Sequence, residues 1–192
     1  MRFLSLWSPK GGAGKTTTAL HLAGAYAARG FKVVVVDLDP QRSALSVQEF
    51  ATTPLPFEIV AGWPKSPEGI EVMIADCPPG FSEAPETGTV IMPFQPSPLD
   101  MASAYRAIET LRSNRNLRIL RVLTMVDLRE NEQRTLANHC MEHGEIERII
   151  KRRSAYRRTL GMGLTVHSAQ VANMQGVRDA RTEIDRLADI AL

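Results

Sequence analysis

The feature that most constrains this chain is a glycine-rich segment near its start, SPKGGAGKTT at residues 8–17. It follows an apolar run typical of a strand, RFLSLW at residues 2–7, and it opens a helical stretch. The segment fits the pattern Gly-x-x-x-x-Gly-Lys-Thr when Pro9 stands for the first glycine. Glycines let backbone N–H groups converge on phosphate oxygens, and a helix N-terminus adds the positive end of its dipole. A strand, this loop and a helix in succession therefore predict a phosphate site of the P-loop NTPase type.

Three side chains of the loop need an explanation. Lys15 is expected to neutralise phosphate charge, and the Thr16 hydroxyl can coordinate Mg²⁺. Lys10 is an additional lysine, which binding phosphate within one chain does not require.

β-type and helical stretches alternate along the 192 residues, and VVVV at 33–36 is a continuous apolar run of the kind found in strands covered on both faces. The alternation predicts an α/β fold of three layers, in which helices cover both faces of a mostly parallel twisted sheet of about seven strands. No linker or repeat divides the chain, so we expect a single domain over residues 1–192. The expected strands are 2–7, 31–37, 57–60, 70–76, 88–94, 117–125 and 145–150, and the expected helices are about 15–29, 42–51, 98–113, 130–142, 153–160 and 170–191.

Two of these helices have marked starts. Ser97 precedes Pro98 and stands three residues before Asp100, which is the spacing of an N-cap with an acid in the first turn. Asp127 and Glu130 repeat the cap-and-acid spacing. Both starts are therefore predicted to be capped by side chains.

Carboxylates stand at the ends of two expected strands. Asp37 and Asp39 follow VVVV, and Asp76 ends VMIAD. The carboxyl ends of parallel strands lie at the ligand-binding edge of such a sheet, where one carboxylate can hold Mg²⁺ and another can orient an attacking water. Each aspartate taken alone is more typical of a turn, but the three together with the phosphate loop favour a nucleotide site.

The motifs KGGAGKTT, DLDPQ and ADCPPG together resemble the deviant Walker ATPases of the ParA/MinD superfamily. Three later segments are similar to the plasmid-partition ParA branch, in particular to its short ParF-like members: MPFQPSPLDMASA (92–104), VLTMVDLR (122–129) and RRSAYRRTLGMGLTV (152–166). The similarity covers almost the whole chain except about 43–70. Cys77 and Pro9 depart from the residues usual in the family, and the short span from Asp39 to Asp76 indicates that a helix is reduced to a loop at 62–69.

The resemblance implies an ATPase that uses ATP and Mg²⁺ and forms a homodimer in the ATP state. In that superfamily the additional lysine reaches the nucleotide of the partner subunit, which is the role implied for Lys10. The implied catalytic residues are Lys10, Lys15 and Asp39; the implied metal residues are Thr16, Asp37 and Asp76; the implied nucleotide contacts are Lys10, Gly11, Gly12, Ala13, Gly14, Lys15, Thr16 and Thr17.

The segment IERIIKRRSAYRRTL (146–160) carries six basic residues against one acid in a chain of net charge +2. Guanidinium groups suit phosphate backbones, and binding without sequence preference needs only charges that track phosphates. The resemblance implies non-specific DNA binding here, and release through a centromere-binding ParB-type adaptor, so we expect a DNA partition ATPase in the bacterial cytoplasm, associated with the nucleoid. The predicted DNA contacts are Lys151, Arg152, Arg153, Arg157 and Arg158, whereas Tyr156 is expected to pack inside.

The composition of the C-terminal stretch and the cysteine spacing disfavour two alternative functions, membrane anchoring and iron–sulfur transfer. The C-terminal stretch RTEIDRLADIAL mixes acids with arginines, and the chain has no transmembrane-length apolar run, so we expect no membrane anchor. Cys77 and Cys140 lack CxxC spacing, which disfavours an iron–sulfur carrier and predicts two reduced thiols. A MinD-like or other cargo-positioning ATPase of the same superfamily stays open, as does an amidoligase-related synthetase.

Overall fold

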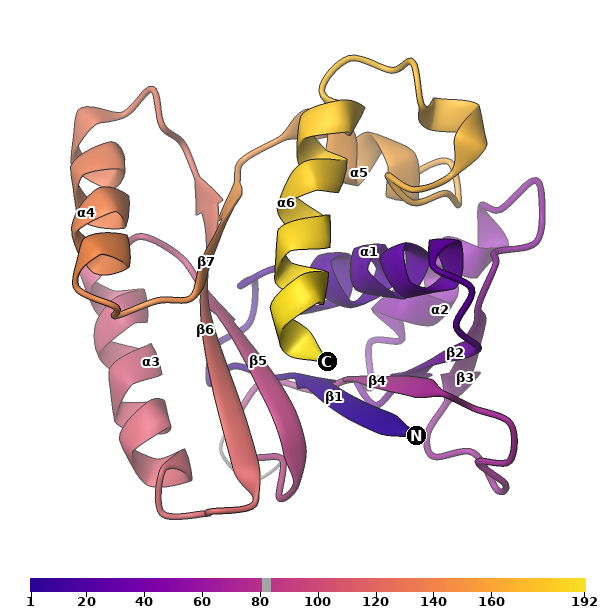
Figure 1. Ribbon diagram of the computed structural model, residues 1–192, viewed down its shortest axis with the longest axis horizontal. Helices are drawn as coiled ribbons and strands as arrows, with labels where there is room; N and C mark the ends of the chain where they lie inside the picture. The colour runs from indigo at the N-terminus through magenta and orange to yellow at the C-terminus, as the bar shows by residue number, and fades with distance from the viewer. Residues whose placement is uncertain (81–83) are drawn as a thin grey trace.

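The computed structural model describes residues 1–80 and 84–192, and its seven strands form one sheet in which every pair is parallel (Figure 1). The order across the sheet is β3-β2-β4-β1-β5-β6-β7. The predicted α/β class is confirmed, and the sheet is more regular than predicted because, in the described part of the chain, all of its neighbouring strands are parallel. The strands are β1 (Arg2–Leu6), β2 (Val33–Asp37), β3 (Glu58–Ala61), β4 (Val72–Asp76), β5 (Gly88–Phe94), β6 (Leu117–Val126) and β7 (Arg148–Lys151).

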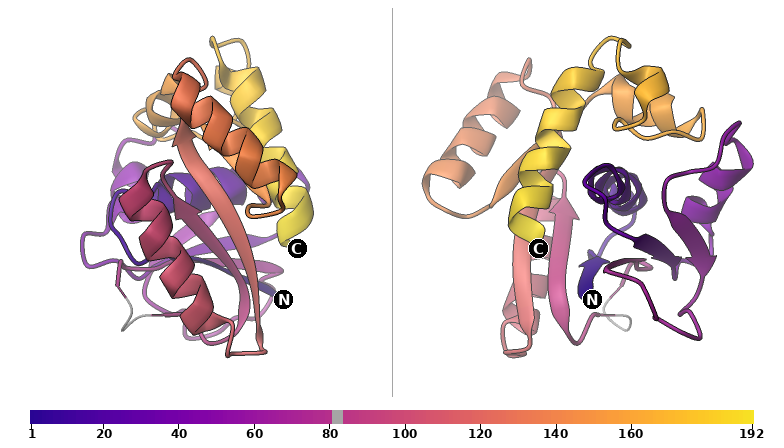
Figure 2. Two further views of the ribbon diagram at one scale, coloured as in Figure 1. Left: turned by 90° about the vertical axis from the view of Figure 1, so that its left-hand side faces the viewer. Right: turned by 45° about the vertical axis from the view of Figure 1, so that its right-hand side comes forward.

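Helices cover both faces of the sheet, as predicted. In Figures 1 and 2, the helices that follow β5 and β6 lie on one side of these strands, and the first and last helices lie on the other. The first layer contains α3 (Pro98–Leu111) and α4 (Asn131–Glu142), and the second contains α1 (Lys15–Ala28), α2 (Ser43–Glu49), α5 (Ser154–Leu160) and α6 (Val177–Ala191). Strands β2 and β4 are buried at every residue, because both of their faces are covered.

One part of the sheet is covered by a loop instead of a helix. Val34, Val36 and Met73 form a small separate core on β2 and β4. Phe3 packs against this core, and its ring contacts Trp63 with the ring centroids 5.6 Å apart. No helix occurs at residues 62–69, which confirms the predicted reduction to a loop.

Two predictions of helix starts were wrong. The predicted helix at 170–191 begins only at Val177, because Gly176 takes a left-handed φ of 80° and separates α6 from a short 3-10 turn at Ala169–Val171. Asp127 does not cap α4: its carboxylate binds Arg129, and Glu130 occupies the cap position, where its side chain accepts from Gln133 and makes no capping bond to the helix backbone. The start of α3 is confirmed, since the Ser97 side chain accepts a hydrogen bond from the Asp100 backbone N–H.

The strand order brings the predicted site residues to one edge. β4 lies between β1 and β2, and Asp76 is the register partner of both Leu6 and Asp37. The phosphate loop leaves β1 directly after Leu6 and enters α1 at Lys15. Asp37, Asp76 and the loop therefore meet at the carboxyl edge of the sheet.

Candidate functional site

The phosphate loop has a backbone conformation that requires its glycines. Gly12 and Gly14 have φ angles of 75° and 86°, which side chains disfavour, and Gly14 is the left-handed cap from which α1 begins. Lys15 is the first residue of α1 and is buried. The unpaired backbone N–H groups of the first turn of α1 point to the same region, so the loop combines backbone donors, a helix dipole and a lysine.

Two neighbouring strands hold the loop in place. The Gln95 side-chain amide donates to the Gly12 carbonyl at 3.0 Å, and the Thr124 hydroxyl lies 2.9 Å from the Ala13 carbonyl. Gln95 follows β5 and Thr124 lies in β6. These bonds occupy loop carbonyls, which leaves the loop N–H groups available for an anion.

Asp76 is the least satisfied polar group at this edge. It is 1% exposed, and neither of its carboxylate oxygens has a hydrogen-bond partner among the described residues. Burial raises its pKa to about 7; the Thr16 hydroxyl acts in the opposite direction, without a hydrogen bond of good geometry, and the charge of Asp37 adds to the rise. A buried carboxylate of this kind calls for a cation.

Residues 1–80 and 84–192 contain no group of three or more His, Cys, Asp or Glu side chains that could hold a metal ion by themselves. Mg²⁺ characteristically takes only one or two protein ligands and completes its shell with phosphates and waters. The orphaned oxygens of Asp76, next to the Thr16 hydroxyl, fit that pattern.

Asp37 and Asp39 have local hydrogen-bond partners. Asp37 is buried; its Oδ2 accepts from the backbone N–H groups of Ala44 and Leu45 at the start of α2, and its Oδ1 accepts from Asp39 N–H. Asp39 is half-buried and one of its oxygens accepts from Gln41 N–H, as in an aspartate turn. Asp37 thus fixes α2 and the Asp39 loop, and the predicted roles of both residues at the metal and the water stay predictions.

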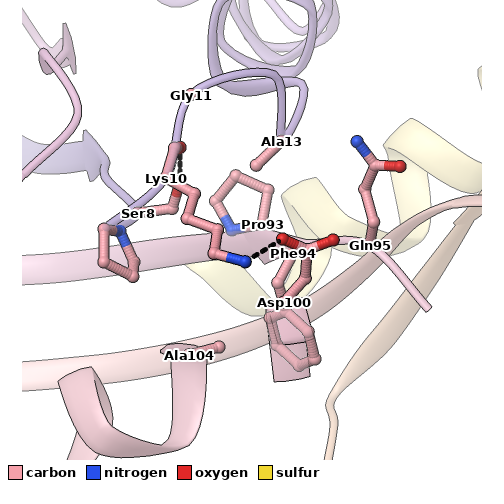
Figure 3. Close-up of a pocket in the computed structure, with 10 residues that line it drawn as sticks. Ser8, Lys10, Gly11, Ala13, Pro93, Phe94, Gln95, Asp100 and Ala104 are labelled. Carbon is pink, nitrogen blue, oxygen red and sulfur yellow. Dashed lines mark hydrogen bonds and ion pairs between the residues drawn. The ribbon is translucent and has the colours of Figure 1, made fainter. Parts of the chain in front are cut away.

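Lys10 lies on the outer side of the loop and differs from Lys15 in burial and in its ion-pair partner. Its side chain is 43% exposed, and its Nζ lies 2.9 Å from Oδ1 of Asp100 at the start of α3, as Figure 3 shows. The sequence interpretation missed Asp100 as a partner, because it assigned SPLD only to a helix cap. The Ser97 hydroxyl also donates to the other Asp100 oxygen, and this bond is the main reason why the pKa of Asp100 is lowered.

A cavity of about 200 Å³ opens on the other side of the phosphate loop. Met125, next to Thr124 at the end of β6, has a left-handed φ of 56°, which is unusual for a residue with a side chain. The end of β6 and the start of α1 both line this cavity. The lining residues are Gly14, Thr17, Thr18, Thr124, Met125, Ile150, Lys151, Arg152, Arg153, Tyr156 and Arg157.

The predicted DNA segment divides into two groups. Arg153 binds Glu183 of α6 through Nε at 3.0 Å and Nη2 at 2.7 Å, and its Nη1 binds Asp179. Lys151 also lies beside Glu183, and Tyr156 is buried with its hydroxyl bonded to Glu183, as the packing prediction expected. Arg152, Arg157 and Arg158 are exposed. The structure therefore ties Arg153 to α6 and leaves three arginines at the surface.

Over residues 1–80 and 84–192, none of the helices is both long enough and apolar enough to cross a membrane.

A model of the CobQ/CobB/MinD/ParA nucleotide-binding domain matches residues 4–166. The maintenance of carboxysome distribution protein A of Gloeobacter kilaueensis is 31% identical over 208 residues, covering 98% of this chain and 93% of that protein.

Two solved structures show the same fold. A plasmid partition protein of Borrelia burgdorferi bound to AMPPNP superimposes with a TM-score of 0.72 at 14% identity and covers 98% of each chain. A Cyanothece McdA–ATP complex superimposes with a TM-score of 0.73 at 16% identity and covers 100% of this chain and 96% of the other. Nucleotides are thus bound on this fold in other proteins.

The full-length relative favours the alternative expectation, a cargo-positioning ATPase, over the narrower plasmid-partition assignment. With the phosphate loop, the orphaned strand-end aspartate and the matched residues 4–166 agreeing, this chain belongs to the CobQ/CobB/MinD/ParA family of nucleotide-binding ATPases.

Proposed function

We propose that this chain is an ATP-dependent positioning ATPase that pairs with a second copy when it holds ATP and separates after hydrolysis. The observation that carries the proposal is the contrast between its two loop lysines. Lys15 is buried at the start of α1, where it serves its own phosphate site, whereas the Lys10 side chain is half-exposed and points away from that site toward Asp100. A cation that solvent reaches at that place can compensate the γ-phosphate charge of a neighbouring subunit, as an arginine finger does.

The residues proposed for ATP binding and hydrolysis lie at the carboxyl edge of the sheet, around the phosphate loop. The loop N–H groups and Lys15 would hold the phosphates, and the Thr16 hydroxyl with the Asp76 carboxylate would hold Mg²⁺. Mg²⁺ supplies charge neutralisation of the β- and γ-oxygens when it is bound. Asp39 would orient the attacking water, and Asp37 would support the metal shell and fix the Asp39 loop through its bond to the Asp39 N–H. The reaction converts ATP and water to ADP and phosphate.

The base end of the nucleotide would lie in the cavity beside Met125. The cavity adjoins Gly14, Thr17 and Thr18 at the start of α1, so it is continuous with the phosphate site. Its walls combine apolar surface from Ile150 and Met125 with polar groups, which suits a heterocycle. Arg152 and Arg157 line it too, so these two arginines stand between the nucleotide and the surface.

We propose that the dimer binds DNA without sequence preference through Arg152, Arg157 and Arg158, on the nucleoid in the cytoplasm. A dimer presents six such arginines, which predicts a slope of about −5 for the logarithm of DNA affinity against that of salt concentration. Cargo would be linked through an adaptor protein that stimulates hydrolysis. Similarity to a protein named for the maintenance of carboxysome distribution supports a carboxysome or a comparable body as cargo, and the fold of the Borrelia protein keeps a plasmid with a ParB-type adaptor as a second candidate.

The central test compares nucleotide states. Light scattering with Mg-ATP should give a dimer that retards duplex DNA, and Mg-ADP should give a monomer that binds DNA weakly. Lys10→Ala should abolish the ATP dimer. Lys32→Ala is the matched control, because Lys32 is an exposed lysine just before β2, at the opposite edge of the sheet. Equal mass and equal DNA affinity in both nucleotides would refute the proposal.

The water-orienting role has its own test. Asp39→Ala should keep ATP binding and prolong the dimer, since hydrolysis would be slowed while the phosphate contacts stay intact. A variant with wild-type turnover of ATP would assign that role to another residue.

A further inference from the structure

Lys10 is held by an anchored carboxylate. Oδ1 of Asp100 lies 2.9 Å from Lys10 Nζ, while Oδ2 accepts the Ser97 hydroxyl at 2.5 Å. The Ser8 hydroxyl bonds the Lys10 carbonyl at 2.8 Å, so the backbone of the lysine is fixed as well. Figure 3 shows the lysine side chain extended from the loop toward the first turn of α3, and the cavity between them measures only about 10 Å³. The two charges are therefore in direct contact.

We propose that Asp100 is a latch that restrains Lys10 within its own subunit until ATP on a second copy competes for it. The inference rests on the proposed function, because it assigns a regulatory contact to the same lysine. To pair with a phosphate on the second subunit, the Lys10 ammonium group must first break its ion pair with the Asp100 carboxylate, which lies 2.9 Å away. Asp100 then opposes dimerisation, and only a ligand with a γ-phosphate offers enough negative charge to displace it.

The position of the latch supports this reading. Asp100 belongs to α3, whose N-terminal turn also carries Leu99, and Leu99 is 77% exposed. Burial of this apolar side chain would add to the stability of a dimer in which a second subunit covers the start of α3. Docking of a second copy there would desolvate the latch and the leucine together.

The expected effect of the latch on dimer affinity can be estimated from the solvent exposure of the ion pair. The side chains of Lys10 and Asp100 are 43% and 27% exposed, and ion pairs of such exposure shift an equilibrium by up to about fivefold. Both subunits must open a latch, so removal of both should strengthen the dimer by up to about 25-fold. Positioning of Lys10 by Asp100 is the opposite mechanism, and it predicts that removal weakens the dimer.

The experiment measures the dimer dissociation constant of the full chain with Mg-AMPPNP by sedimentation over a range of protein concentrations. Asp100→Asn should lower it several-fold, and Asp100→Gln should act in the same direction. Glu109→Gln is the matched control, because Glu109 is an exposed acid of the same helix and pairs only with Arg112 among the described residues. Thermal unfolding of each variant shows whether α3 is intact.

A second comparison separates the latch from a general change of surface charge. In the Lys10→Ala chain, which should stay monomeric, Asp100→Asn should produce no dimer. A dimer that Asp100→Asn restores without Lys10, or an unchanged or weaker dimer in Asp100→Asn alone, would overturn the latch alone. A wild-type chain that stays monomeric with Mg-AMPPNP would overturn the proposed function and the latch with it.

Discussion

Replacement of Arg153 by alanine should destabilise the fold more than it weakens DNA binding. The sequence analysis predicts Arg153 as one of the DNA contacts, but the structure uses its guanidinium to pair with Glu183. The side chain of Glu183 is only 8% exposed, whereas that of Arg153 is 21% exposed. Removal of the arginine therefore leaves a carboxylate that water reaches poorly.

The cost can be judged from the bonds that remain. Oε1 of Glu183 loses both guanidinium donors, while Oε2 keeps the Tyr156 hydroxyl at 3.0 Å and the Lys151 N–H at 3.1 Å. Breaking a fully buried pair costs about 3–5 kcal/mol, so the residual donors bring the expected loss to about 2–3 kcal/mol. For a chain of this size the melting temperature should fall by about 5–10 °C.

The assay is chemical unfolding of the nucleotide-free chain, together with fluorescence anisotropy of a labelled duplex in Mg-ATP at a temperature where all variants are folded. Arg158→Ala is the matched control, because Arg158 is exposed and lies outside the cavity; it should weaken DNA binding and change stability by less than about 0.5 kcal/mol. Adding Glu183→Gln to Arg153→Ala should recover part of the lost stability. Wild-type stability combined with lost DNA binding in Arg153→Ala would refute the assignment.

Three further predictions concern buried groups. Burial lowers the pKa of His21 to about 3, so stability should fall as pH drops from about 6.5 toward 3, and His21→Gln should flatten that dependence in urea unfolding at several pH values. Gly24→Ala should cost about 1–3 kcal/mol in thermal unfolding, because the new Cβ would lie 2.3 Å from the Thr165 hydroxyl oxygen. Asp76→Asn should abolish Mg²⁺-dependent ATP binding in calorimetry, yet stabilise the nucleotide-free chain at pH 7 by about 1–3 kcal/mol. The sign follows from the raised pKa: the unfolded chain ionises Asp76 above about pH 4 and the folded chain only near pH 7, so stability is lost across that interval.

The parts of the site that are local in sequence could be predicted from sequence. The phosphate loop requires glycines with left-handed φ angles at positions 12 and 14, and no other residue type adopts them as easily. The strand ends could be predicted too, since all-buried strands such as β2 and β4 read as continuous apolar runs. Strand order, which makes Asp37 and Asp76 register partners, depends on packing between distant segments.

The parts that depend on competition between partners could not be predicted. A run of arginines has the same composition whether its members face solvent or an acid on a distant helix, and Glu183 lies 30 residues from Arg153. The same holds for Asp127: its carboxylate binds Arg129, two residues away, and therefore does not cap the helix that follows. Charge patterns in sequence identify groups that will interact, and the fold decides with which partner.

Competition for charged partners also links the two proposed effects of ATP, which are dimerisation through Lys10 and DNA binding through the exposed arginines. Lys10 is shared between Asp100 and a second subunit's phosphate in the proposal, and Arg152 and Arg157 line the cavity that would hold the base while also facing solvent. A nucleotide in that cavity would lie against the same arginines that are offered to DNA. The occupied site would then order those side chains, so nucleotide state should alter DNA affinity of each subunit as well as the number of subunits. A DNA affinity per subunit that is identical in the Lys10→Ala monomer with Mg-ATP and without nucleotide would confine the switch to dimerisation alone.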